Sequence, residues 1–168
     1  MYPACQSSKL LMGQLVAYNL VTPSRSFLSP QTFLRQFDFG NDHERQYVKY
    51  VAKLAIDDKV RIHLLTNDEN KPVAFIALSF EKIVTNSCLV VNYLFCSMQY
   101  RKLIVKELQD RKISHHLIAR AIQLVQEISP YVPLQYLALQ PAHENLERFY
   151  ADFGFTRLHH KEWMFLKV

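Results

Sequence analysis

The chain has 168 residues, of which 49% are hydrophobic, and it carries three cysteines and a formal net charge of +5. This length predicts one domain, and no apolar run reaches the ~20 residues that a membrane-spanning helix needs. The N-terminal residues lack the features of a secretory signal, so we expect a cytoplasmic protein with no membrane partner. The cysteines form neither a metal-binding spacing nor an even disulfide framework. The basic charge favours anionic partners such as CoA phosphates, tRNA or an acidic protein.

The first third of the chain contains one clear helix. Leu10–Leu20 is apolar enough for a short strand or helix. Asn41 followed by Glu44 suits a helix start, because the Asn side chain accepts from an unpaired amide and the Glu reaches back. Apolar residues within Tyr47–Ala55 then recur at helical spacing, which predicts a helix packed on a sheet.

Five apolar runs predict the strands. Arg61–Thr66 and Val73–Val84 flank a polar turn and read as a hairpin. Val73–Val84 and Cys88–Met98 are apolar almost throughout, which is typical of central strands covered on both faces. The two cysteines of the second run are predicted to be buried thiols. Leu134–Leu139 and Trp163–Val168 follow as later strands.

A helix is predicted over Ala142–Ala151, between the last two strands. Leu146, Phe149 and Tyr150 fall at helical spacing, and Gly154 stands where the helix stops. A residue just after a helix often adopts the left-handed conformation, which glycine adopts most easily. On this pattern alone, Tyr150 is either a packed core residue or a functional hydroxyl.

This stretch resembles the last third of the GNAT N-acetyltransferases, whose pattern is Asn-x-x-Ala-x-x-Phe/Leu-Tyr-x-x-x-Gly-Phe. Here the Tyr and Gly-Phe match at Tyr150, Gly154 and Phe155, while His143 stands at the Asn position. The resemblance covers Asp38–Val168. It implies one α/β (α+β) domain over residues 1–168: a mixed, mostly antiparallel sheet flanked by helices, with splayed fourth and fifth strands.

The resemblance also implies acetyl-CoA as cosubstrate, without a metal. Tyr150 would be the general acid for the departing thiolate. A backbone amide near Cys96 or Ser97, at the end of the fourth strand with Phe95, would polarise the thioester carbonyl. His143 would contact the cofactor or cap the helix.

The cofactor's pyrophosphate would bind at the start of the following helix, where the family has Gln/Arg-x-x-Gly-x-Gly/Ala. In this chain both glycine places are changed, to Lys112 and Ser114, and extra residues precede the loop. Backbone amides and the positive helix end bind phosphate, and basic side chains add charge. Ser114 is predicted as the N-cap. The predicted phosphate-binding residues are Gln109, Asp110, Arg111, Lys112, Ile113, Ser114 and His115.

The acceptor is ranked by a second resemblance. Phe37–Asn41 resembles the Phe-Asp-Cys-Gly-Asn opening of GNAT toxins from toxin–antitoxin pairs, which acetylate the amino group of aminoacyl-tRNA. No general base is evident: Val90 stands where many family members carry a Glu, and Glu81 and Glu144 are candidates by position only. An α-amine, with a pKa of about 8, needs a weaker base than lysine. The expected partners are therefore a CoA thioester, an amine-bearing acceptor such as aminoacyl-tRNA, and an antitoxin or a second copy of the chain.

Two other functions remain open on the sequence. The missing glycines favour a GNAT-fold interaction module that no longer binds cofactor, and the basic charge alone favours an RNA-binding protein. Adjacent histidines, as in His115-His116, point in different directions, so a metal site is not expected.

Overall fold

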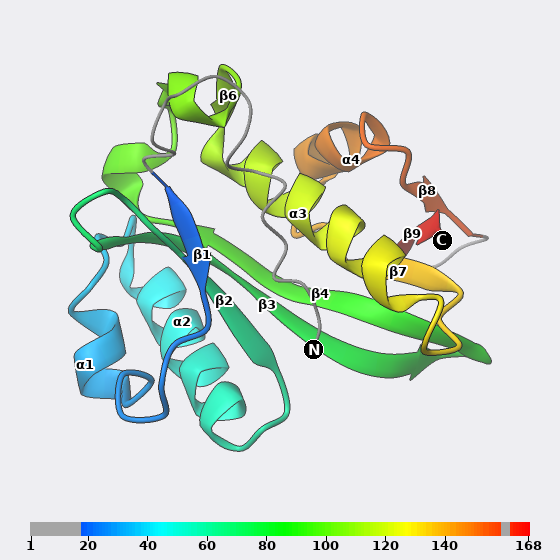
Figure 1. Cartoon of the computed structure of the whole chain (residues 1–168), viewed down its shortest axis with the longest axis horizontal. Helices are drawn as coiled ribbons and strands as arrows, with labels where there is room; N and C mark the ends of the chain where they lie inside the picture. Colours follow the sequence, from blue (N-terminus) through cyan, green and yellow to red (C-terminus); the bar gives the residue numbers. More distant parts are fainter. Residues whose placement is uncertain (1–17, 159–161) are drawn as a thin grey trace, which may run out of the picture.

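The computed structural model describes residues 18–158 and 162–168, which form one seven-stranded sheet, a two-stranded sheet and helices (Figure 1). The strands are β1 (Asn19–Val21), β2 (Arg61–Thr66), β3 (Pro72–Ile83), β4 (Asn86–Cys96), β5 (Ile104–Val105), β6 (Arg111–Lys112), β7 (Tyr136–Leu139), β8 (Thr156–Arg157) and β9 (Met164–Lys167). The helices are α1 (Pro30–Leu34), α2 (Asp42–Ile56), α3 (Ile113–Ile128) and α4 (Glu144–Ala151), with 3-10 turns η1 (Met98–Tyr100) and η2 (Lys106–Leu108).

The large sheet has the order β1-β2-β3-β4-β7-β9-β8, and all its pairings are antiparallel except β4 with β7. The predicted hairpin is confirmed as β2–β3. Its turn is held by the Asn67 side chain, whose Oδ1 accepts from the amides of Glu69 and Lys71 at 3.1 and 2.9 Å. The residues 73–79 of β3 are all buried, as expected of a central strand.

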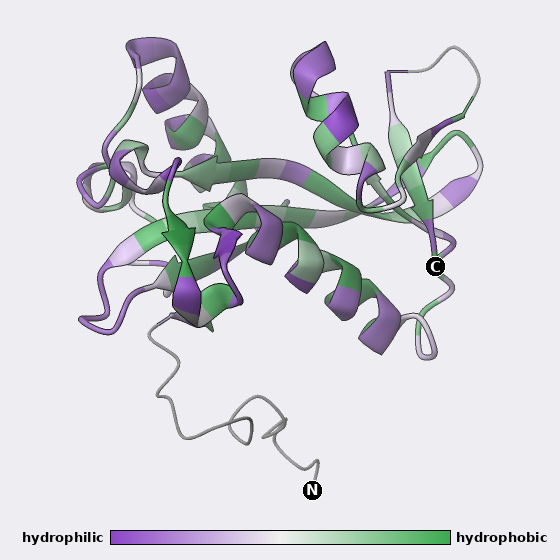
Figure 2. Cartoon of the chain, turned by 90° about the horizontal axis from the view of Figure 1, so that it is seen from above, coloured by the Kyte–Doolittle hydropathy of each residue, from purple (hydrophilic) through white to green (hydrophobic). Residues whose placement is uncertain are grey.

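The core lies on both faces of this sheet, and helices lie on both sides of it (Figure 2). On one face, which we call the α2 side, Val48, Val51 and Ala55 of α2 pack with Phe75 and Phe95 of the sheet. On the other face, the α3 side, a second cluster joins α3 to the sheet and includes Tyr150 and Phe155. Figure 1 shows α3 running along β4. The mixed α+β class with a mostly antiparallel sheet is confirmed.

The parallel ladder between β4 and β7 is short. It begins at Cys88–Tyr136 and its last pair is Val91–Leu139, whereas β4 continues to Cys96. Beyond Val91, β4 pairs with β3 and with no other strand of residues 18–158 and 162–168. These two strands are fourth and fifth in the order of the sheet, so the predicted separation of that pair is confirmed. We call the β7-facing side of residues 92–96 the unpaired edge of β4.

The helix termini confirm part of the prediction and correct part. The Asn41 Oδ1 accepts from Glu44 N at 2.9 Å, as expected, but the Glu44 carboxylate accepts from Gly40 N rather than from the Asn41 amide. Ser114 is not the N-cap of α3: the helix begins at Ile113 and Lys112 is the N-cap, because β6 delivers extended backbone directly into the helix.

Further findings concern α4 and the chain termini. His143 is the N-cap residue of α4, yet its side chain makes no capping hydrogen bond. Most of the predicted element Leu10–Leu20 lies outside the described residues, and so does Cys5. The end of that element, from Asn19, belongs to β1. Cys88 and Cys96 are buried free thiols, as predicted. Among residues 18–158 and 162–168, none of the helices combines the length and apolar character that crossing a membrane requires.

Candidate functional site

The unpaired edge of β4 offers free backbone groups. Ser97 N donates to Val73 O at 3.0 Å, so the Ser97 amide points toward β3. Successive residues of a strand direct their amides to opposite sides, so the amides of Cys96 and Leu94 point toward β7, where the ladder has already ended. Either the Cys96 or the Ser97 amide was predicted to polarise a carbonyl. Because the Ser97 amide already donates to Val73 O, the Cys96 amide is the better candidate.

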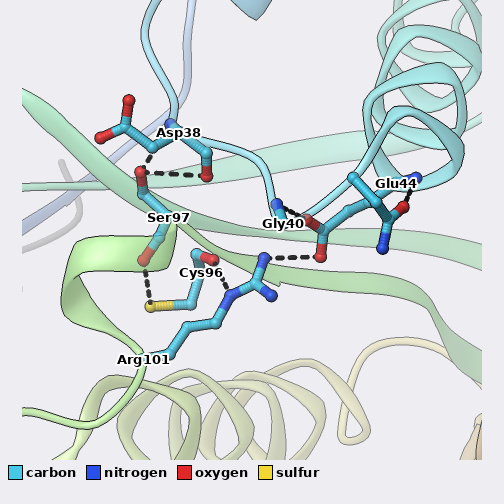
Figure 3. A network of polar contacts seen from close by, with 7 residues as sticks. Asp38, Gly40, Glu44, Cys96, Ser97 and Arg101 are labelled. Atoms are coloured by element: carbon cyan, nitrogen blue, oxygen red, sulfur yellow. Dashed lines mark hydrogen bonds and ion pairs between the residues drawn. The ribbon is translucent and has the colours of Figure 1, made fainter.

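The end of β4 is held in place by the segment Asp38–Gly40 (Figure 3). The Ser97 hydroxyl accepts from Asp38 N at 2.8 Å, and Met98 N donates to Asp38 O at 3.0 Å. Gly40 packs closely here: a Cβ would lie 3.3 Å from the Met98 sulfur. The backbone of the Phe-Asp-Phe-Gly motif thus fixes the position of the strand end, and its Asp side chain is not needed for these bonds.

An ion pair completes this network. Glu44 of α2 accepts from Arg101 Nη2 at 2.5 Å and from Gly40 N at 2.7 Å. The Arg101 Nε donates to Cys96 O at 2.8 Å, and the guanidinium lies 5.5 Å from the centre of the Phe95 ring. The sequence analysis assigned no role to Arg101. In the sequence, Arg101 is marked by the Tyr-Arg pair that follows the fourth strand. The role of Arg101 is visible only in the structure, where it joins α2 to β4.

The predicted phosphate-binding residues surround the start of α3. The extra residues before this point form the β5–β6 hairpin, in which Ile104 pairs with Lys112 and Val105 with Arg111. Gln109 and Asp110 both have positive φ, 60° and 56°, so the turn uses the left-handed region without glycine. Lys112, at a family glycine place, has φ −68°, which any residue adopts. The backbone at Lys112 therefore requires no glycine.

The first turn of α3 suits an anion. It holds no acidic residue, its N-cap side chain makes no capping hydrogen bond, and the flanking Arg111 and Lys112 are exposed. The free amides of the first helical turn and the helix dipole favour negative charge at this end. Ile113 is buried and anchors the turn to the core, which leaves Ser114 and His115 half-buried beside it.

His115 links the start of α3 to α4. Its ring lies 4.8 Å from Phe149 and 5.7 Å from Phe153, measured between ring centres. Its Nδ1 is buried without a hydrogen-bond partner among the described residues. Burial, helped by Lys112 and Arg111, lowers the pKa of His115. The imidazole is therefore neutral at pH 7, and the positive charge at this end comes from Arg111 and Lys112.

Tyr150 is fixed near the C-terminal end of α4. The motif that follows it is a Schellman turn: Gly154 N donates to Ala151 O at 2.9 Å and Phe155 N to Tyr150 O at 3.3 Å, with Gly154 at φ 94°. The rings of Tyr150 and Phe155 pack at 6.1 Å. Burial raises the pKa of Tyr150, so its hydroxyl keeps its proton at neutral pH and can act as a proton donor.

His143 lies apart from the predicted phosphate site. It lines a polar hollow at the start of α4 together with Gln140, Glu144, Glu147, Arg157 and Glu162. Glu147 and Arg157 form an ion pair in its wall. The predicted phosphate-binding residues thus lie at the start of α3, and Phe95, Cys96 and Ser97 lie at the end of β4. His143 lies in a third place, at the start of α4. Within the described residues, no group of three or more His, Cys, Asp or Glu side chains could hold a metal ion.

The residues present fit a CoA thioester. The unpaired edge of β4 offers amides that could pair with an amide-containing arm, and the start of α3 offers amides and two cations for phosphates. Burial raises the pKa of Cys96 to about 11, so this thiol stays protonated beside the edge and does not compete as a nucleophile. When bound, the cofactor would supply an acetyl group activated as a thioester.

No protein-family model matches the chain, and no curated protein matches it by sequence. Solved structures match over nearly the whole chain. A crystal structure of AtaTR bound with AcCoA has a TM-score of 0.71 and 15% identity, covering 91% of this chain and 94% of that one. AtaT complexed with acetyl-methionyl-tRNAfMet has a TM-score of 0.68 and 13% identity, over 89% and 94%. A tyrosine-to-phenylalanine mutant of the AtaT toxin, bound to the C-terminus of the antitoxin AtaR and acetyl-CoA, has a TM-score of 0.66 and 15% identity, over 89% and 92%.

These likenesses show the fold. The order of elements, the parallel β4–β7 pair that ends early and the helix between them belong to the GNAT-like fold. The expected GNAT architecture is therefore confirmed.

Proposed function

We propose that this protein transfers an acetyl group from acetyl-CoA to a primary amine, and that the amine is the α-amino group of an aminoacyl-tRNA. The observation that carries the proposal is the unpaired edge of β4, which runs from the last β4–β7 pair toward the basic start of α3. One extended cofactor can occupy both places, with its thioester at the edge and its phosphates at the helix.

The chemistry requires a polarised carbonyl and a proton for the leaving sulfur. The Cys96 amide on the unpaired edge is the donor to the developing oxyanion. Tyr150, whose pKa is raised by burial, holds a proton that the departing thiolate can take. The amine nitrogen attacks the carbonyl carbon, an N–C bond forms and the C–S bond breaks. No covalent enzyme intermediate is needed.

The acceptor proposal has its own support on the α2 side of the sheet. Tyr47 and Tyr50 are exposed on α2, and the Tyr47 ring lies 4.6 Å from that of Tyr93 on β4. Exposed aromatic rings beside a basic surface stack nucleobases without strict sequence preference. The net charge of +5 favours tRNA over a neutral small amine. AtaT, a neighbour in structure, was solved with acetyl-methionyl-tRNAfMet.

The partners we propose besides the cofactor and the tRNA are an antitoxin and a second copy of the chain. The support is again a likeness: the AtaT toxin was solved with the C-terminus of the antitoxin AtaR. Co-expression with a candidate antitoxin followed by gel filtration measures this directly.

The test is acetyl transfer from radiolabelled acetyl-CoA by the purified full chain. The acceptors are a pool of aminoacyl-tRNAs, the same pool after deacylation, a peptide with a free N-terminus and a lysine-containing peptide with a blocked one. We expect label only on the aminoacylated pool. Label on a peptide alone would overturn the tRNA acceptor, and no label on any acceptor would overturn the transferase.

A second candidate is an interaction module that binds no cofactor. The observation in its favour is Arg101, whose Nε already donates to Cys96 O on the unpaired edge. In that function the side chain would be a permanent substitute for the cofactor. Binding of acetyl-CoA decides between the two functions.

A further inference from the structure

A polar cluster on the α2 side of the sheet has no part in the function described so far. It consists of Ser79 and Glu81 on β3 and Asn92 on β4, and we call it the Glu81 cluster. The Ser79 hydroxyl donates to Glu81 Oε1 at 2.7 Å, and Asn92 Nδ2 donates to the same oxygen at 3.2 Å. These two hydrogen bonds to one oxygen fix the orientation of the Glu81 carboxylate.

The strand pattern explains why these three residues meet. Phe75 and Ala77 of β3 lie in the α2-side core, and alternation puts Ser79 and Glu81 on the same face. The register of β3 and β4 shifts between Ala77 and Leu78, which leaves Asn92 as an extra residue in β4. Such a bulge re-aims a side chain, and here it brings the Asn92 amide to Glu81.

The cluster contains two acceptor oxygens without donors. Glu81 Oε2 makes no hydrogen bond among the described residues. Because a carboxylate only accepts, Asn92 must present its nitrogen to Glu81, so its Oδ1 points elsewhere. That Oδ1 is buried and also lacks a partner within the described part of the chain. Glu81 itself is exposed, so its Oε2 is open to a ligand. A primary ammonium carries three N–H donors and a positive charge, which suits this oxygen.

The position of the cluster connects it to the thioester. Asn92 is the first β4 residue beyond the last β4–β7 pair, Val91–Leu139, so it stands at the start of the unpaired edge. Tyr150 packs in the α3-side cluster, whereas Glu81 lies on the α2 side. The two groups therefore lie on opposite faces of the sheet. This arrangement separates the site of proton removal from the site of proton donation.

We propose that the Glu81 cluster binds the acceptor amine and that Glu81 takes a proton from it, an inference that rests on the proposed acetyl transfer. Two protons leave the nitrogen during the reaction. Glu81 Oε2 takes the first from the ammonium and releases it to solvent, since Glu81 is exposed. The neutral amine then forms the N–C bond as the C–S bond breaks. Glu81 takes the second proton from the nitrogen, while Tyr150 protonates the thiolate and regains its proton from solvent. Asn92 and Ser79 act as positioning residues.

The variant Glu81→Gln tests the role of the carboxylate, because glutamine keeps an acceptor for Ser79 and Asn92 but takes no proton. We expect kcat to fall about 100-fold or more at pH 7, as for loss of a general base. The loss shrinks above the amine's pKa of about 8, where the acceptor is already neutral. The dissociation constant for acetyl-CoA and the melting temperature stay unchanged. The matched control is Glu69→Gln, in the β2–β3 turn, which retains wild-type kcat. An E81Q protein with wild-type kcat at pH 7 would overturn the inference.

A binding measurement separates this inference from the transferase. Methioninamide, a small α-amine, is titrated into the CoA-bound protein while the Asn92 side-chain amide is followed by NMR. We expect its signals to shift in the wild type and not in E81Q. No shift in the wild type overturns the amine site even if acetyl is transferred. A shift in a protein that transfers acetyl to no acceptor supports the amine site and contradicts the transferase.

Discussion

The two ends of the proposed cofactor site are built in different ways. The thioester end is made of regular strand and helix: β4 is fixed by Asp38 and Glu44, and Tyr150 is fixed by the Schellman turn at Gly154. The phosphate end is a short exposed hairpin whose turn uses left-handed Gln109 and Asp110. The first end therefore depends on specific contacts between distant segments, whereas the second depends on local backbone direction and charge.

The largest expected effect is at the thioester end. Replacing Tyr150 with Phe keeps the packing against Phe155 but removes the proton donor, so we expect kcat to fall about 100-fold to 10,000-fold. Binding of acetyl-CoA, measured by calorimetry, should not change. Tyr131→Phe, at a tyrosine that is 84% exposed, is the matched control. A Y150F protein with full activity would refute the role of this hydroxyl.

At the phosphate end a charge change should matter more than any single side chain. The double variant Arg111→Glu, Lys112→Glu reverses the charge at the start of α3, and we expect acetyl-CoA binding to weaken about tenfold or more. Single alanine variants should change it only about twofold to threefold, because the helix amides remain. The double variant Lys49→Glu, Lys53→Glu, at two exposed residues of α2, makes the same change in net charge and is the control. Equal binding by the double variant and by this control would show that the cofactor does not use the start of α3.

Binding of the acceptor tRNA can be tested separately from the two ends of the cofactor site. Tyr50 is 55% exposed on α2 and makes no core contact, so Tyr50→Ala should leave stability unchanged. If the ring stacks on a base, kcat/KM for aminoacyl-tRNA should fall about tenfold, while kcat/KM for a small amine stays constant. Tyr131→Ala is the control. An equal loss with both acceptors would contradict stacking.

A smaller effect is expected on the stability of the turn that positions Tyr150. Gly154 has φ 94°, and a Cβ there would lie 3.2 Å from the Leu166 side chain. Gly154→Ala should therefore lower the free energy of unfolding by about 1–2 kcal/mol, measured by urea denaturation. Gly40→Ala, where φ is not in the left-handed region, should strain only its contacts with Met98 and Arg101. Equal stability of wild type and G154A would contradict the strained turn.

The smallest effect is the pH dependence of folding. Burial lowers the pKa values of His63, His115 and His116. A lowered folded-state pKa means that the stability is present above the unfolded value of about 6.5 and is lost as pH falls below it. We expect the free energy of unfolding to decrease between pH 7 and 5. His116→Gln should reduce this decrease. A flat profile in the wild type would contradict the buried, neutral histidines.

The sequence predicted the structure at the thioester end of the site better than the structure at the phosphate end. The strands, α2 with its Asn41 cap, α4 and the Gly154 turn were predicted because hydrophobic period and local capping determine them. The β5–β6 hairpin was not predicted, because two-residue strands leave no periodic signal. The N-cap of α3 was wrongly placed at Ser114 for the same reason: nothing in the sequence shows that β6 continues into the helix.

The site was predictable where one segment carries it and unpredictable where several meet. Tyr150 and the stretch 109–115 are local patterns, so they were found. Arg101 and the Glu81 cluster join residues far apart in the chain, and the Asn92 bulge follows from pairing of β3 with β4. Glu81 was a candidate by position alone, and only its two hydrogen-bond donors give a reason to choose it over Glu144.

Calorimetric titration of the full chain with acetyl-CoA tests the central claim most directly. The account predicts micromolar binding that weakens as salt increases, since Arg111 and Lys112 contribute charge at the start of α3. No heat at millimolar acetyl-CoA, from protein that circular dichroism shows to be folded, would contradict it and favour the interaction module.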